Sequence, residues 1–277
     1  MWGLEGKVAQ QIALIGYGEA GSTFARAGEW ASRAAAWDVK PERRAAALAD
    51  GLRSGDDAGS VMAGAALVLS LVAADAALPA AQDYAALLPA GAIWCDCNSV
   101  APDTKRAAAK AIEAAGGRYV DVAVLAPVDP ARLKVPLLLA GKHAAEAEAL
   151  LRAAGFANVR VVGEEIGRAS AIKMIRSVMV KGVEALTAEM MLGAQAAGVV
   201  DEVLASLDAS EKARPWAEKA AYNIERMVTH GLRRAAEMEE SAKTLQSLGI
   251  EPEMTRGTVA RQREMAGRTD RLIEGRE

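Results

Sequence analysis

The sequence predicts an α/β fold in which a doubly wound sheet is followed by an all-helical C-terminal domain. Up to Gly163, short apolar runs alternate with alanine-rich stretches of helical periodicity. A glycine-rich loop at residues 16–21 follows the first apolar run directly, and the strand signal disappears after Gly163. Such alternation is typical of βαβ units around a parallel sheet, whereas a sustained 3.6-residue repeat indicates helices alone.

The first part contains seven candidate strands and four clear candidate helices. The strands are expected at residues 11–16, 34–38, 66–72, 92–96, 119–124, 135–141 and 159–163. Amphipathic helices are expected at residues 21–32, 42–51, 104–116 and 144–155. Several of these helices run into a glycine, the residue that most readily takes the left-handed conformation of a C-cap.

The second part is rich in helix from about residue 168 onwards. Breaks are expected near residues 196–202, 208–216 and 247–255. The periodicity changes near residue 165 without a linker rich in proline, glycine or serine. We therefore predict two domains, 1–165 and 166–277, that are docked tightly rather than tethered.

Composition argues against several classes of protein. A chain of 277 residues with 52% hydrophobic residues can form one large core or two modest ones. The net charge of −3 is spread over both parts, so no nucleic-acid or membrane partner is expected. The apolar run near the N-terminus is too short to span a membrane, and a cytoplasmic protein is expected. Cys95 and Cys97 lie far in sequence from His143 and His230, so no metal site is expected.

The glycine-rich loop has the spacing G-x-G-x-x-G at Gly16, Gly18 and Gly21. In a Rossmann-type domain the first glycine makes a tight turn, the second lets a pyrophosphate approach, and the third lets the helix pack on its strand. The following helix N-terminus then attracts the phosphates. We predict a dinucleotide-binding domain; the alternative is a purely structural turn. The other predicted cofactor contacts are Tyr17, Glu19, Ala20 and Val72.

The second predicted strand ends at Asp38, 22 residues after Gly16. At this spacing a carboxylate accepts hydrogen bonds from the adenine ribose and repels a 2′-phosphate, which favours NAD. Lys40, Arg43 and Arg44 follow closely and keep NADP open as the alternative, although a solvated turn and helix face explains them more simply.

Four segments make the chain similar to the β-hydroxyacid dehydrogenases, the relatives of 6-phosphogluconate dehydrogenase and 3-hydroxyisobutyrate dehydrogenase. They are "GYGEAG", "DCNSVAP", "DVAVLAP" and "GRASAIKMIRS", and the resemblance covers nearly the whole chain. It implies hydride transfer between a nicotinamide cofactor and a small hydroxy acid or related alcohol. It also implies that Ser99, beside Asn98, lies near the nicotinamide and substrate, and that Lys173 is the catalytic residue.

A lysine suits this chemistry, because an alcohol that loses hydride must also lose its hydroxyl proton. An amine whose pKa is lowered by burial can accept that proton near neutral pH. Ser177 stands where the family has asparagine, four residues after Lys173, so both can face one substrate. A structural lysine that extends its amine to solvent is the alternative.

Departures from the family pattern concentrate on the residues expected to contact substrate. Leu125 and its neighbours replace a Ser/Gly-rich segment, so a more apolar pocket is expected. His230, Arg233 and Glu237 have spacing i, i+3, i+7 and could face the cleft, with Arg233 holding an anionic group. An exposed charged helix face explains these three equally well.

The resemblance also implies a homodimer that buries the long apolar helix beginning near residue 168. Two other functions remain open. An imine reductase shares the architecture but usually lacks the lysine, and a non-catalytic dinucleotide-binding regulator fits the departures at Leu125 and Ser177.

Overall fold

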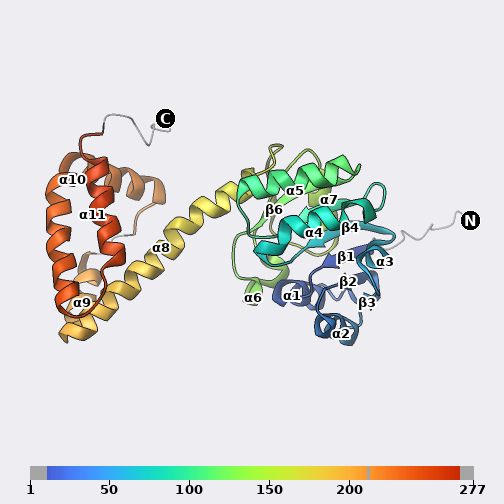
Figure 1. The fold of residues 1–277 in the computed structure, drawn as a ribbon, viewed down its shortest axis with the longest axis horizontal. Coiled ribbons are helices and arrows are strands. Elements are labelled where there is room, and N and C mark those ends of the chain that lie inside the picture. The colour runs from blue at the N-terminus through green and yellow to red at the C-terminus, as the bar shows by residue number, and fades with distance from the viewer. Residues whose placement is uncertain (1–10, 211–212, 269–277) are drawn as a thin grey trace, which may run out of the picture. The chain divides into compact units, whose positions relative to one another are not determined.

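The computed structural model describes residues 11–210 and 213–268, and the chain divides into two compact units, Met1–Arg176 and Ser177–Glu277 (Figure 1). The last strand of the first unit ends at Gly163. The division lies eleven residues beyond residue 165, because the first turns of the following helix pack against the first unit. In that segment Ser170 and Lys173 donate hydrogen bonds to Asp121 and Ser99 of the same unit.

An eight-stranded sheet with the order β3-β2-β1-β4-β5-β6-β7-β8 forms the centre of the first unit. The predicted strands are all present within two residues, and the two-residue strand β3 is an addition. The strands are β1 Gln11–Ile15, β2 Ala34–Trp37, β3 Arg53–Ser54, β4 Ala65–Ser70, β5 Ile93–Asp96, β6 Arg118–Val124, β7 Leu137–Ala140 and β8 Val159–Gly163. The helices are α1 Glu19–Ala27, α2 Pro41–Ala49, α3 Ala58–Met62, α4 Ala77–Tyr84, α5 Pro102–Ala114, α6 Val128–Ala131 and α7 Ala144–Ala153.

The sheet is not parallel throughout, which corrects one expectation. β1 to β6 pair in parallel, but β7 pairs antiparallel with β6. Parallel strands are usually joined by a crossover helix, whereas the link from β6 to β7 holds only the short helix α6 and a single 3₁₀ turn. Helix α1 also ends earlier than predicted, because Trp30 folds into the core and donates its indole N–H to the Ala154 carbonyl at 2.8 Å.

Two apolar layers cover the two faces of the sheet. Alternate strand residues such as Leu14 and Leu69 face a layer that contains residues of α1, α2 and α7. Their neighbours such as Ile15 and Val68 face the other layer, which contains residues of α3, α4 and α5. Strands buried on both faces read as continuous apolar runs, which is why the sequence located them well. The prediction of a Rossmann-type, doubly wound fold is confirmed.

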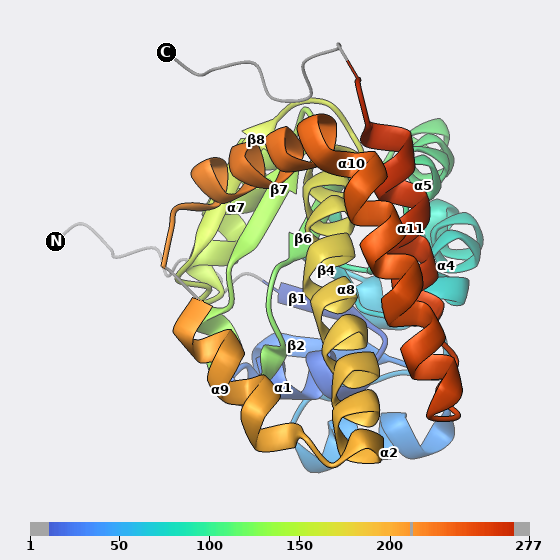
Figure 2. The same cartoon turned by 90° about the vertical axis from the view of Figure 1, so that its left-hand side faces the viewer.

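The second unit is helical, with breaks where the sequence places them. Its elements are the rest of α8 (Arg168–Ala197), α9 (Val200–Ser210), α10 (Trp216–Ser247) and α11 (Glu253–Met265). Helices α10 and α11 lie side by side (Figure 2), and a Cβ on Gly231 would lie 2.3 Å from the Gln262 carbonyl oxygen, so this contact requires glycine. Within the described ranges, no helix has the length and hydropathy of a membrane span.

Glu189 on α8 caps the start of α11. Its carboxylate accepts hydrogen bonds from the backbone N–H of Met254 at 2.7 Å and of Thr255 at 2.9 Å. The Thr255 hydroxyl donates a third at 2.6 Å. Burial alone would raise the pKa of Glu189, but these hydrogen bonds outweigh it and the pKa is lowered.

We predict that this carboxylate makes stability depend on pH. Because the pKa of Glu189 is lower in the folded chain, its contribution is complete above the ordinary value of 4.5 and is lost as pH falls through the folded value. Glu189→Gln should cost about 1–3 kcal/mol at neutral pH and weaken the acid-side slope, measured by urea unfolding across the acid range. Glu240→Gln, which removes a carboxylate from an exposed pair with Lys243, is the matched control. An unchanged slope in Glu189→Gln contradicts the assignment.

Candidate functional site

The glycine loop joins β1 to α1 and has the geometry that its spacing predicts. Gly16 has φ +98°, and a Cβ there would lie 2.5 Å from the Leu71 carbonyl oxygen. A Cβ on Gly21 would lie 2.6 Å from the Gly16 carbonyl oxygen, so this glycine allows helix and strand to touch. A Cβ on Gly18 meets no described heavy atom within 4 Å, and no side chain caps α1. The open side of the loop is therefore where an anion can approach the helix N-terminus.

One cavity of about 210 Å³, the Asp38 cavity, opens at the ends of β1 and β2. Its lining residues are Ile15, Gly16, Trp37, Asp38, Val39, Val72, Ala76, Pro79, Ala80, Asp83 and Tyr84. Asp38 is held firmly, because its two carboxylate oxygens accept the backbone N–H groups of Tyr17 at 2.8 Å and Lys40 at 2.9 Å.

The three basic residues after Asp38 differ in their surroundings. The Arg44 guanidinium lies 4.9 Å from the centre of the Trp37 ring and donates to the Asp38 carbonyl at 2.8 Å. Lys40 and Arg43 are exposed. None of the three is among the residues that line the Asp38 cavity.

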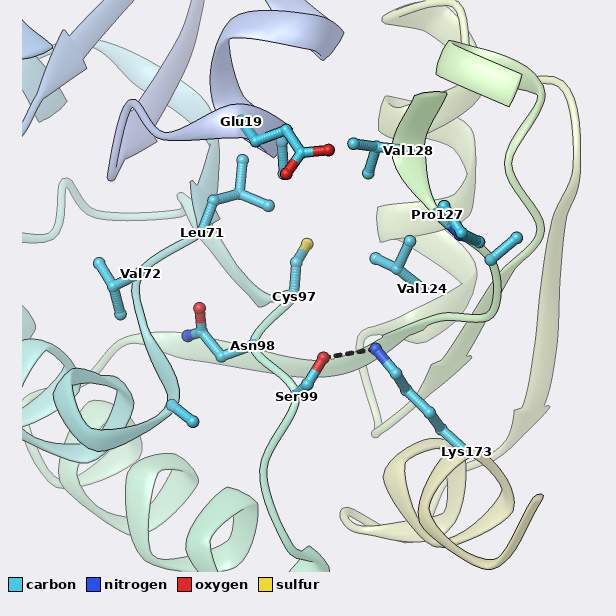
Figure 3. Close-up of a pocket in the computed structure, with 13 residues that line it drawn as sticks. Glu19, Leu71, Val72, Cys97, Asn98, Ser99, Val124, Pro127, Val128 and Lys173 are labelled. Carbon is cyan, nitrogen blue, oxygen red and sulfur yellow. Dashed lines mark hydrogen bonds between the residues drawn. The ribbon is translucent and has the colours of Figure 1, made fainter. Parts of the chain in front are cut away.

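A second cavity of about 450 Å³, the Lys173 cavity, lies beside the ends of β4, β5 and β6 (Figure 3). It brings together five of the predicted site residues: Glu19, Ala20, Val72, Ser99 and Lys173. The Lys173 ammonium donates a hydrogen bond of 2.5 Å to the Ser99 hydroxyl. Glu19, at the first position of α1, lies on the side of the cavity opposite Lys173.

The two cavities are neighbours, because Val72 lines both and the glycine loop contributes to both. Gly16 lines the Asp38 cavity, whereas Glu19 and Ala20 line the Lys173 cavity. An extended dinucleotide can therefore place one nucleoside in each cavity and its pyrophosphate on the N-terminus of α1. The residues present thus fit a nicotinamide dinucleotide.

The wall of the Lys173 cavity that follows β6 is apolar. It consists of Val124, Ala126, Pro127 and Val128. Leu125, the expected substrate contact, packs instead in a small cluster with Ala123 and Leu138, and its neighbours rather than Leu125 line the cavity.

Cys97 also lines this cavity, and sequence reasoning did not place it there. Burial raises the pKa of its thiol to about 12, so the thiol stays protonated at neutral pH and is a poor nucleophile. The other lining residues missed from sequence, such as Leu71 and Ala74, follow the carboxyl end of β4. That edge of a doubly wound sheet is where ligands bind, so the strand pattern itself carried the signal.

The remaining predicted residues are divided between the two units. The Tyr17 side chain is buried in the core and its hydroxyl donates to Asp50 at 2.7 Å, so only the backbone of this residue is left to contact a cofactor. Ser177 follows Lys173 by one turn of α8 and belongs to the second unit. His230 and Arg233 are exposed on α10.

The side chain of Glu237 lies outside the described residues. Among the described residues, no group of three or more His, Cys, Asp and Glu side chains could hold a metal ion.

A buried ionic network lies beneath the cavity and was not predicted. Lys105 on α5 is fully buried, with its ammonium 2.9 Å from an Asp96 carboxylate oxygen and 3.5 Å from one of Asp121. The sequence carried a signal for it: Lys105 occupies the same apolar stripe as Ala108, Ala109 and Ile112. A lysine on the buried face of a helix needs a buried partner.

Comparisons with known proteins agree with this geometry. The model of the NAD binding domain of 6-phosphogluconate dehydrogenase matches residues 11–163, and a domain of unknown function, DUF1932, matches residues 194–265. A conserved hypothetical protein from Sinorhizobium meliloti 1021 is 40% identical, covers 93% of this chain and 88% of its own, and has a TM-score of 0.62. A conserved protein of unknown function, MTH1747, described as structurally similar to 3-hydroxyacid dehydrogenases, is 28% identical. The match covers 92% of this chain and 96% of that protein, with a TM-score of 0.60.

A more distant likeness shows the fold alone. An imine reductase from Myxococcus stipitatus, solved as a variant with NAD⁺, is 18% identical over 92% of this chain and 93% of its own, with a TM-score of 0.75. The first unit is an NAD-binding domain, which confirms the predicted cofactor class. The chain belongs to the β-hydroxyacid dehydrogenase family, as its glycine loop and its three other motifs predicted.

Proposed function

We propose that the protein is an NAD-dependent oxidoreductase that moves hydride between the nicotinamide and a small hydroxy acid or related alcohol. The oxidoreductase class follows from the family. The observation that carries the finer proposal is the Lys173 ammonium on the Ser99 hydroxyl, inside a cavity that adjoins the Asp38 cavity. This arrangement supports a proton donor beside the proposed position of the hydride carrier.

Lys173 acts as general acid and base in this proposal. When NAD is bound, its nicotinamide supplies the acceptor for hydride. In oxidation the Lys173 amine takes the hydroxyl proton of the substrate, and in reduction the ammonium polarises the carbonyl and returns the proton. Ser99 orients the amine through its hydroxyl. The wall of Val124 and Val128 excludes water and favours substrates with an apolar group on that side.

We predict a preference for NADH over NADPH. The Asp38 carboxylate lines the cavity proposed for the adenosine half, where its charge repels a 2′-phosphate. Arg44, one of the candidates to attract that phosphate, rests on the Trp37 ring. Fluorescence titration with both reduced coenzymes measures the preference. Tighter binding of NADPH overturns the assignment of Asp38.

The apolar wall also favours a second candidate, an imine reductase, because an imine substrate needs no carboxylate-binding residues there. Turnover of hydroxy acids, simple alcohols and cyclic imines with the preferred coenzyme separates the two. A protein that binds NADH but turns over none of these substrates is a dinucleotide-binding regulator, and the enzymatic proposal then fails.

We also propose that the chain forms a homodimer through α8. This helix exposes large apolar side chains along its length, among them Ile175 at 72%, Val178 at 76% and Val183 at 50% of their surface. An apolar face of this extent marks an interaction surface. Light scattering of the full chain distinguishes the proposed dimer from a single chain.

A further inference from the structure

The buried lysine of α5 lies between two carboxylates that each hold a different part of the site. Lys105, Asp96 and Asp121 are all inaccessible to solvent. Buried charges are costly unless they are paired and hydrogen-bonded, and a buried ion pair is by itself weak support for stability. The network links the end of β5 to the start of α8, and these two segments carry Ser99 and Lys173.

Asp96 holds the loop that carries Ser99. One of its carboxylate oxygens accepts hydrogen bonds from the Asn98 backbone N–H at 3.0 Å and side-chain amide at 2.8 Å. The other accepts the Tyr119 hydroxyl at 2.8 Å. Lys105 donates to both the side chain and the carbonyl oxygen of Asp96. Tyr119 and Lys105 therefore hold Asp96, and Asp96 in turn holds Asn98, the residue before Ser99.

Asp121 holds the helix that carries Lys173. One carboxylate oxygen accepts the backbone N–H groups of Gly167 at 3.2 Å and Ser170 at 3.0 Å, as well as the Ser170 hydroxyl at 3.2 Å. A carboxylate at this end of α8 also complements the helix dipole. The other oxygen is buried, has no hydrogen-bond partner among the described residues, and faces the Lys105 ammonium at 3.5 Å.

We propose that Lys105 is a positioning residue for the reaction: it fixes the start of α8 against the β5 loop, so that the Lys173 amine stays on the Ser99 hydroxyl. The inference rests on the proposed function, in which Lys173 transfers the proton. The two carboxylates carry more negative charge than Lys105 alone balances. Without its ammonium they repel each other, and the loop and the helix that they hold move apart.

The test compares Lys105→Met with Ile112→Ala, a cavity-forming change on the same helix and the same buried face. Each variant is treated with trinitrobenzenesulfonate, and the labelling of Lys173 is measured by peptide mass spectrometry relative to the exposed Lys181. Labelling of Lys173 should rise by about tenfold in Lys105→Met, as expected when a hydrogen bond to a charged group is lost. Ile112→Ala should leave the ratio unchanged even though it also lowers the melting temperature.

Turnover supplies a second readout on any substrate found active. We expect kcat to fall by about a hundredfold in Lys105→Met, the size of effect that misplacement of an aligned group produces, with NADH binding unchanged. Ile112→Ala should retain kcat. If no substrate is turned over, the proposed function fails, whereas the labelling ratio still decides whether Lys105 positions Lys173.

Ser170→Ala covers the case in which Lys105→Met does not fold. It removes one of the hydrogen bonds to Asp121 and keeps the three charges. Labelling of Lys173 should rise in the same direction by a smaller factor, with faster hydrogen exchange at residues 167–173. The proposal is overturned if Ser170→Ala and Lys105→Met leave the labelling ratio at the wild-type value, or if Ile112→Ala changes the ratio as much as they do.

Discussion

Lys173→Ala should abolish turnover while NADH still binds. Removal of a positioned general acid and base costs about a thousandfold in rate, and among the described residues no other lysine lines the cavity. The glycine loop and the Asp38 cavity are untouched, so coenzyme affinity should stay at the wild-type value. Steady-state kinetics with the best substrate and NADH fluorescence titration measure the two effects separately.

Lys181→Ala is the matched control, because Lys181 lies on the same helix about two turns further on and is exposed. It should keep full activity. Undiminished turnover in Lys173→Ala would refute the catalytic role. If Lys173→Ala also lost its affinity for NADH, the catalytic role would be contradicted as well, because the amine would then bind the coenzyme rather than transfer a proton.

Gly18→Val should leave the fold intact and eliminate most of the affinity for NADH. The backbone of Gly18 is extended, with φ −80° and ψ −155°, and space is open where its Cβ would stand. Valine fits the folded chain there, but its methyl groups fill the path of the pyrophosphate. We expect binding to weaken by about a hundredfold, equivalent to the roughly 3 kcal/mol of one or two hydrogen bonds to a charged group. Titration with NADH and thermal unfolding without it separate binding from stability.

Gly16→Ala provides the contrast. Its φ of +98° and the Leu71 carbonyl oxygen 2.5 Å from the added Cβ make alanine costly, by about 1–3 kcal/mol. This variant should lose stability as well as binding. If Gly18→Val binds NADH normally, the cofactor does not pass over the loop, and the fit of a dinucleotide to the two cavities is wrong.

The fold could be read from the sequence because its signals are local. The strands are apolar on both faces, and glycines close several of the first unit's helices, so periodicity located them within a few residues. The strand β3 has only two residues, Arg53 and Ser54, and no apolar pattern marks it. The antiparallel direction of β7 depends on how the link from β6 folds in space. The local sequence pattern of β7 does not show this.

The candidate site could be predicted from the sequence where a single loop or a single motif forms it. Residues of the glycine loop, Ser99 and Lys173 were expected to lie together from motif spacing, and they line the two adjoining cavities. The sequence did not show that the Tyr17 side chain turns into the core, so any contact of this residue with the cofactor must come from its backbone. The role of Lys105 was missed because its partners come from β5 and β6. An ion pair between segments far apart in sequence shows locally only as a lysine on the apolar face of a helix.

The two backbone hydrogen bonds of Asp38 have a consequence for coenzyme engineering. Because the proposed preference for NADH rests on the Asp38 carboxylate, this acid is the first residue to consider for a change of coenzyme. Here that acid also ties down Tyr17 of the glycine loop and Lys40 of the next turn, so its removal loosens the loop that any dinucleotide must use. A redesign for NADPH should therefore keep Asp38 and introduce a cation at Val39, which is 73% exposed and borders the same cavity.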